Sequence, residues 1–134
     1  MKEVFILQEL KYLLLDYLQK IGITADFNLE LKDYSKSLFG RYNPNNNTVI
    51  LYVYDSLKCN QSYTVWDLLK TLIHEVCHCE QWNDPKFIRH KGVMHNTDFW
   101  SRYNKYIEVA TELLSTQQKG VVFINEKITF RQKK

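Results

Sequence analysis

The chain has 134 residues, of which 45% are hydrophobic and 14% aromatic. This composition excludes a disordered or fibrous chain, and the length suits one packed core. Its 18 Lys and Arg against 15 Asp and Glu leave a net charge of only +3, which excludes a strongly basic or strongly acidic protein. We therefore expect a single domain over residues 1–134, with at most weak, non-specific DNA binding by its basic loop around Lys86 and its basic tail over 131–134.

The cysteines and the N-terminal segment indicate the compartment. Cys59, Cys77 and Cys79 are odd in number and irregular in spacing, so we expect reduced thiols in a cytoplasmic protein. Glu3 and Glu9 interrupt the apolar N-terminal stretch. The sequence therefore predicts neither a signal peptide nor a membrane span.

The first half of the chain predicts one helix and three strands. Apolar residues recur with a helical period over 3–21, and Gly22 provides a stop. Apolar and polar residues then alternate over 23–31, which predicts a half-buried strand. Two more strands are predicted over 39–42 and 48–54, and the asparagine-rich turn between them would make them an antiparallel pair.

The second half predicts two helices. Thr64, with a carboxylate three residues later, resembles a capping box and predicts a helix over 65–81. We expect a basic loop over 83–94 and a second helix that begins at Asn96 or Thr97 and ends before Gly120. Residues 121–130 alternate loosely, which allows a hairpin or an added strand.

A metal-binding pattern lies within the first of these two helices. His74 and His78 are four residues apart, so their imidazoles would project from one helix face at neighbouring heights. This spacing suits two ligands of a zinc ion, and Glu75 between them could act as a general base towards a zinc-activated water. Because a pattern this short can also arise by chance, the alternative is a surface helix with two unrelated histidines.

A catalytic zinc ion needs a third protein ligand. The metzincin arrangement would place a histidine six residues after the second histidine of the motif, but Asp84 stands there, which excludes that class. Three candidates remain: His95 before the next helix, His90 in the basic loop, and Glu108 with Glu112 on the next helix. Cys77 and Cys79 flank His78 and are expected to be packing residues.

Three segments together resemble the SprT-like zinc metallopeptidases, the family that includes the Spartan proteases and compact YgjP-type bacterial proteins. Gly40-Arg41-Tyr42 followed by Thr48-Val49-Ile50-Leu51 is similar to the hairpin that precedes the active-site helix of this family. Thr71-Leu-Ile-His-Glu-Val-Cys-His78 is similar to the motif helix. His95-Asn-Thr-Asp-Phe-Trp100 is similar to the segment that supplies the third ligand, with Asn96 where the family usually has glycine.

The resemblance implies a zinc metalloendopeptidase in which His74, His78 and His95 bind Zn²⁺ and Glu75 is the general base, with a protein or peptide as substrate. It implies an α+β, minimal zincin-like fold with an N-terminal helix, a small mainly antiparallel sheet and two helices that meet at the metal. It also implies that the strand over 48–54 is the sheet edge along which a peptide binds. We expect neither a zinc ribbon nor a separate DNA-binding module after the catalytic segments.

Other residues could support such a site. Asp98 and Asp84 are candidates to orient the zinc ligands by accepting hydrogen bonds from imidazole. Tyr103, Tyr106 and Arg102 are candidates to stabilise the oxyanion. The competing hypothesis is a non-catalytic, zinc-stabilised interaction or DNA-binding module on the same scaffold, but a purely structural metal site does not need a glutamate base.

Overall fold

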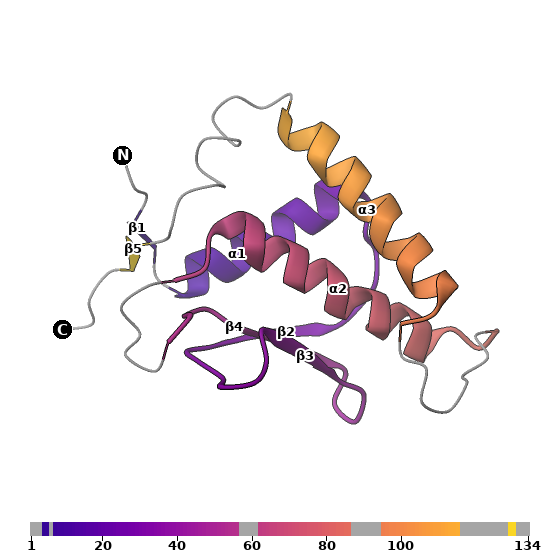
Figure 1. Ribbon diagram of the computed structural model, residues 1–134, viewed down its shortest axis with the longest axis horizontal. Coiled ribbons are helices and arrows are strands. Elements are labelled where there is room, and N and C mark those ends of the chain that lie inside the picture. The colour runs from indigo at the N-terminus through magenta and orange to yellow at the C-terminus, as the bar shows by residue number, and fades with distance from the viewer. Residues whose placement is uncertain (1–3, 6, 57–61, 87–94, 116–128, 131–134) are drawn as a thin grey trace.

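The computed structural model describes residues 4–5, 7–56, 62–86, 95–115 and 129–130 (Figure 1). They form the helices α1 (Leu7–Ile21), α2 (Val65–Asn83) and α3 (Thr97–Ser115). They also form the strands β2 (Asn28–Lys32), β3 (Gly40–Asn43) and β4 (Thr48–Tyr52) and the two short strands β1 (Val4–Phe5) and β5 (Thr129–Phe130).

The main sheet has the strand order β2-β4-β3. β2 lies parallel to β4, with Leu29 beside Val49, whereas β3 lies antiparallel to β4, with Arg41 opposite Ile50. The α+β prediction is therefore confirmed, but the sheet is mixed instead of mainly antiparallel. The reason is the connection after β2: it carries the chain to the far side of β4 before the turn brings it back, so that β2 and β4 run in the same direction.

The prediction that residues 48–54 form the sheet edge is wrong, because β4 pairs with a strand on each side. β2 and β3 are the edges, and β3 is the edge that packs on α2. A Cβ atom built on Gly40 would lie 2.9 Å from the Thr71 Cγ2 and 2.9 Å from the Ile50 carbonyl oxygen. Glycine at this position therefore allows β3 to approach the helix that carries the His-Glu-x-x-His motif.

Several predicted boundaries differ from those of the structure. The first helix begins at Leu7 because Val4–Phe5 pair in parallel with Thr129–Phe130, which is the added strand expected within 121–130. The strand predicted over 23–31 begins only at Asn28, the first residue that pairs with β4. Residues before it alternate between buried and exposed, as at Ile23 and Thr24. The alternation thus indicated burial and not the start of the hydrogen-bonded ladder.

The ends of the helices confirm the predicted stop and start signals. After α1, Gly22 adopts a φ of 95°, and two hydrogen bonds, from Gly22 N to Gln19 O and from Ile23 N to Leu18 O, make a Schellman motif. At the start of α2, the Thr64 Oγ1 accepts a hydrogen bond of 3.1 Å from the Asp67 backbone N–H.

The helices and the sheet pack into layers. In Figure 1, α1 and α2 lie on one face of the sheet, and α3 begins beside the C-terminal end of α2. The core between them draws on all three helices and on β2 and β4; among its fully buried side chains are Leu10, Leu14, Val49, Leu51, Leu69, Leu72 and Phe99. No helix within the described part of the chain is long and apolar enough to cross a membrane.

Candidate metal centre

The three predicted ligand side chains lie together where α2 meets the start of α3. His74 and His78 project from one face of α2, with their ring centroids 5.1 Å apart. His95 stands two residues before α3, and its ring centroid is 5.0 Å from that of each of the other two. One ligand atom from each histidine lies within 4.8 Å of the others, so this group could hold a metal ion.

The geometry and protonation of the cluster suit a cation. The His78 Nε2 and the His95 Nε2 face each other at 3.2 Å, close to the separation of about 3.4 Å expected for two imidazole ligands of one tetrahedral zinc ion. The pKa of His78 is lowered to about 4, and the pKa of His95 is also lowered. Burial is the main cause for both residues, and the neighbouring imidazoles lower both values further. Both rings are therefore neutral at pH 7, as metal ligands must be.

The Phe99 ring contacts all three imidazoles on the side of the protein core. Its side chain is fully buried in the core, and its ring centroid lies 4.9 Å from that of His74, 4.6 Å from that of His78 and 4.7 Å from that of His95. The ring stacks on His78 and meets the other two edge-on. Phe99 thus limits how far each imidazole can turn, because the packed interior has little spare space.

Glu75 lies beside the cluster and contacts its first imidazole. It is 7% exposed, and its Oε2 is 2.8 Å from the His74 Nδ1. A carboxylate at this distance accepts the Nδ1 proton, which leaves the Nε2 lone pair of His74 for a ligand. Glu75 and His74 also line a cavity of about 570 Å³ that opens between α2 and the segment before β3. A substrate in this cavity would reach the carboxylate directly.

Gln81 is a site residue that the sequence analysis missed. Its side chain, which is 4% exposed, donates hydrogen bonds to the Asn96 Oδ1 at 3.2 Å and to the Asp98 Oδ2 at 2.7 Å. The Asn96 Oδ1 also accepts from the Phe99 backbone N–H at 2.9 Å, so Asn96 caps α3. Gln81 therefore joins α2 to the residue that follows His95. A polar residue three positions after the second motif histidine was the only sequence signal for it.

The predicted carboxylate partners of the zinc ligands have other roles. Asp98 accepts hydrogen bonds from Gln81 and from the Arg102 Nε, the latter at 2.8 Å. Both hydrogen bonds lower the pKa of Asp98, and the one from Gln81 contributes more. Asp84 lies 3.2 Å from the Arg102 Nη2. These carboxylates form a network with Arg102 that ties α3 to the end of α2. The hydrogen bonds described for the two candidates reach Gln81 and Arg102 and no imidazole.

The surroundings of the three candidate oxyanion donors distinguish between them. Arg102 is paired with Asp98 and Asp84, and the Tyr106 hydroxyl donates to the Glu80 Oε2 at 2.6 Å. Tyr103 lines the same cavity as His74 and Glu75. Burial is the main cause that raises its pKa, so its hydroxyl remains a donor at neutral pH. Of the three, Tyr103 is therefore the one that faces the space that a substrate would occupy.

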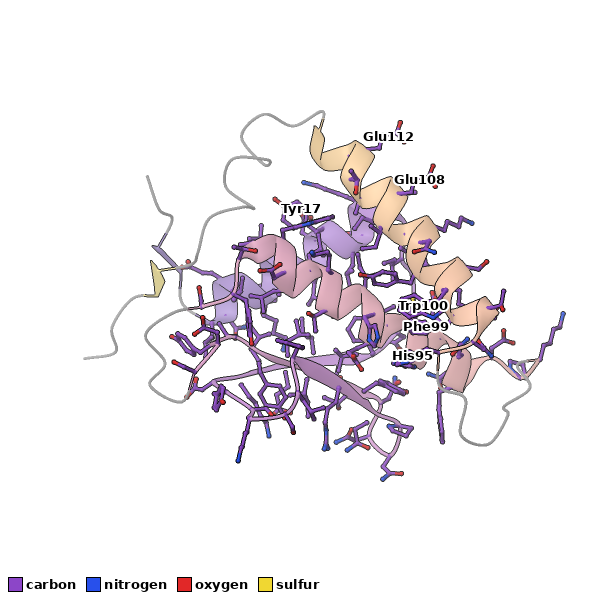
Figure 2. The ribbon with its side chains drawn as sticks, viewed as in Figure 1. Tyr17, His95, Phe99, Trp100, Glu108 and Glu112 are labelled. Carbon is purple, nitrogen blue, oxygen red and sulfur yellow. The ribbon has the colours of Figure 1, made fainter. Side chains whose placement is uncertain are left out.

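The rival ligands are placed elsewhere or lie outside the described residues. Figure 2 shows Glu108 and Glu112 on the part of α3 remote from His95, pointing outward, and both are exposed. His90 lies outside the described residues, so the structure does not test it. Cys77 and Cys79 are buried free thiols, and burial is the main cause that raises the pKa of Cys77 to about 12. They pack in the interior, as predicted.

Comparison with known proteins yields one distant structural match. No protein-family profile and no curated protein matches the chain. Among solved structures, the chain resembles the crystal structure of the metallopeptidase zymogen of Pyrococcus abyssi abylysin, with 16% sequence identity and a TM-score of 0.45. The match covers 81% of this chain and 95% of that one. A similarity this distant carries no argument about function, which has to come from the site itself.

Proposed function

We propose that the protein is a zinc-dependent metalloendopeptidase of the SprT-like type, with His74, His78 and His95 as zinc ligands and Glu75 as general base. The observation that carries the proposal is the convergence of three imidazoles with a carboxylate that lines the adjoining cavity. A structural metal site is usually closed by four protein ligands, whereas three ligands beside an accessible cavity are typical of a catalytic one.

The ligand set favours zinc. Imidazole ligands suit zinc, copper, iron and nickel, while magnesium and calcium prefer oxygen donors. When bound to the three imidazoles, zinc supplies a Lewis acid that polarises the peptide carbonyl and makes a water molecule more acidic. The ligand set needs no thiolate, since Cys77 and Cys79 are buried in the interior and the group that could hold a metal ion in the described part of the chain consists of three histidines.

The chain's own residues then have distinct roles. Glu75 accepts a proton from the attacking water and returns it to the leaving amine. The Tyr103 hydroxyl donates a hydrogen bond to the oxygen that gains negative charge, since Tyr103 lines the same cavity as Glu75. Phe99 packs against all three imidazoles and limits their rotation. The open edge of β3 begins at Gly40, which lines this cavity, and offers backbone groups to an extended peptide.

The experiment that tests the proposal uses the substitution Glu75→Gln. Wild-type protein loaded with zinc should hydrolyse unfolded casein, and the variant should lose this activity by about 10²–10⁴-fold, because an amide cannot take the proton of water. Zinc content and thermal stability should be nearly equal in the two proteins, because Glu75 is not a ligand and the amide oxygen of glutamine can still accept the His74 Nδ1 proton. Removal of zinc by a chelator and its replacement provide the control.

The competing hypothesis predicts a different result. If both proteins bind one zinc ion per chain, neither hydrolyses protein or peptide, and both bind the same partner equally well, the chain is a zinc-stabilised interaction or DNA-binding module. A DNA-binding module would also show an affinity that decreases steeply with salt concentration, because phosphate contacts release counterions.

A further inference from the structure

The cavity beside Glu75 is lined mainly by apolar and aromatic side chains. It has a volume of about 570 Å³ and reaches from the segment before β3 across α2 to α3. Its apolar and aromatic members are Leu38, Phe39, Tyr52, Tyr63, Leu68 and Tyr103. Such a lining favours an apolar occupant, and polar groups in pockets of this kind fix orientation more than affinity.

The cavity offers little to a charged substrate side chain. Besides His74 and Glu75, its charged members are Asp67 and Lys70. Their carboxylate oxygen and ammonium nitrogen are 3.7 Å apart, and the Lys70 ammonium also lies 5.6 Å from the centre of the Trp66 ring. The two charges oppose each other, so neither sign of substrate side chain gains a net attraction here.

Three large exposed hydrophobic side chains, Leu38, Phe39 and Trp100, lie beside the same site. Six large hydrophobic side chains are exposed in the described part of the chain: Tyr12, Leu38, Phe39, Trp82, Trp100 and Val109. Leu38 and Phe39 line the cavity, and Phe39 is 63% exposed. On the other side of the cluster the Trp100 ring is 5.7 Å from the His95 ring (Figure 2). Exposed apolar side chains that adjoin a cavity in this way are typical of a binding surface.

We propose that the substrate is an unfolded protein segment, and that this cavity takes a bulky apolar or aromatic side chain close to the bond that is cut. The inference rests on the proposed function. An extended segment that presents such a side chain occurs mainly in unfolded chains, because folded proteins bury these residues. Phe39 and Tyr63, whose rings meet edge-on at a centroid distance of 5.5 Å, form the wall that selects the side chain.

The test uses soluble peptides of Gly, Ser and Ala that carry a single variable residue, placed in turn at each position. The residue is Phe, Leu, Ala or Asp. Binding is measured by fluorescence anisotropy with the zinc-loaded Glu75→Gln variant, and hydrolysis is measured with the wild type. We expect the affinity of the Phe and Leu peptides to be at least about tenfold higher than that of the Ala peptide. The Asp peptide should bind most weakly.

Three variants locate the preference. Phe39→Ser should reduce the ratio of Phe to Ala affinity at least severalfold, and its exposed position should leave folding intact. Tyr63→Ser is a second change in the same wall. The matched control is Tyr12→Ser, which removes an exposed aromatic ring of α1 outside the cavity and should leave the ratio unchanged.

The outcomes separate this inference from the proposed function. Peptide cleavage at equal rates for Phe, Ala and Asp, with equal affinities, would overturn the inference and leave the peptidase standing. A preference for Phe that persists in both Phe39→Ser and Tyr63→Ser would overturn it as well. Binding with the expected preference but without hydrolysis by the wild type would support the cavity assignment and count against the peptidase.

Discussion

The amide of Gln81 in α2 is joined to Asn96 at the start of α3 by a hydrogen bond of 3.2 Å. Because Asn96 follows His95 directly, this bond restrains the segment that carries the third imidazole relative to α2, which carries the other two. His95 itself has few other constraints: its side chain is exposed, and its described contacts are with the other imidazoles, Phe99 and Trp100. The hydrogen bond therefore pre-organises the cluster for a metal ion.

We predict that Gln81→Leu, which keeps the volume but removes the donor, lowers zinc affinity by about 10–100-fold. Asn96→Ala should have a similar effect, whereas Asn96→Asp should retain affinity because its oxygen can still cap α3 and accept from Gln81. Chelator competition measures the dissociation constant. Asn104→Ala, an exposed change on the same helix, is the control. If Gln81→Leu lowers the thermal stability of the metal-free protein but leaves zinc affinity unchanged, Gln81 is only structural.

Local signals predicted the helices and the motif well. The period of apolar residues and the stop at Gly22 predicted α1, and Thr64 predicted the start of α2, because capping and helical burial depend on residues a few positions apart. The spacing of His74 and His78 predicted that both rings share a face for the same reason. The sequence also named His95 among three candidates, but only a resemblance, not spacing, favoured it.

Long-range relationships could not be predicted. Nothing local to residues 48–54 shows that β4 lies between two strands, because strand order depends on where the chain returns after β2. The same holds for Gln81: its role exists only because α3 begins beside it. Asp98 and Asp84 were candidates to orient the zinc ligands, but both pair with Arg102, which follows Asp98 by four residues in α3 and also reaches Asp84 after α2.

Cys77 and Cys79 should not contribute to metal binding. We predict that the double substitution Cys77→Ala and Cys79→Ala leaves one zinc ion per chain. At pH 8 neither thiol should react with a disulfide reagent in the folded protein, because burial raises the pKa of both, that of Cys77 to about 12. Both should react after unfolding. A Cys59→Ser background removes the remaining cysteine from the measurement, and a loss of zinc in the double variant would contradict the all-histidine ligand set.

The hydroxyl of Tyr103 should matter for the chemical step. We predict that Tyr103→Phe lowers kcat by about 10²–10³-fold with little change in KM, because the hydrogen bond strengthens only as charge develops on the carbonyl oxygen. Tyr106→Phe, which removes a hydroxyl bonded to Glu80 outside the cavity, should change kcat far less. Peptide hydrolysis at several substrate concentrations separates the two constants, and an unchanged kcat in Tyr103→Phe would exclude the role.

The ligand assignment can be tested by comparing the three rival third ligands. We predict that His95→Ala reduces zinc affinity by more than the roughly 100-fold that loss of an outer hydrogen-bonding partner costs. His90→Ala and Glu108→Ala should have small effects, the latter because Glu108 is exposed on α3 outside the cluster. Zinc content after dialysis and the dissociation constant from chelator competition give the comparison.

Thermal unfolding provides an independent measurement of the same assignment. A ligand that binds only the folded state stabilises it by RT ln(1 + [L]/Kd), so added zinc should raise the Tm of the wild type, of His90→Ala and of Glu108→Ala. It should raise the Tm of His95→Ala much less, because the higher Kd reduces this term at the same zinc concentration. Without zinc, His95→Ala should unfold near the wild-type temperature, since the side chain it removes is exposed. If zinc stabilises His95→Ala as much as the wild type while His90→Ala or Glu108→Ala loses the metal, the third ligand lies elsewhere and His95 is only a neighbour of the site.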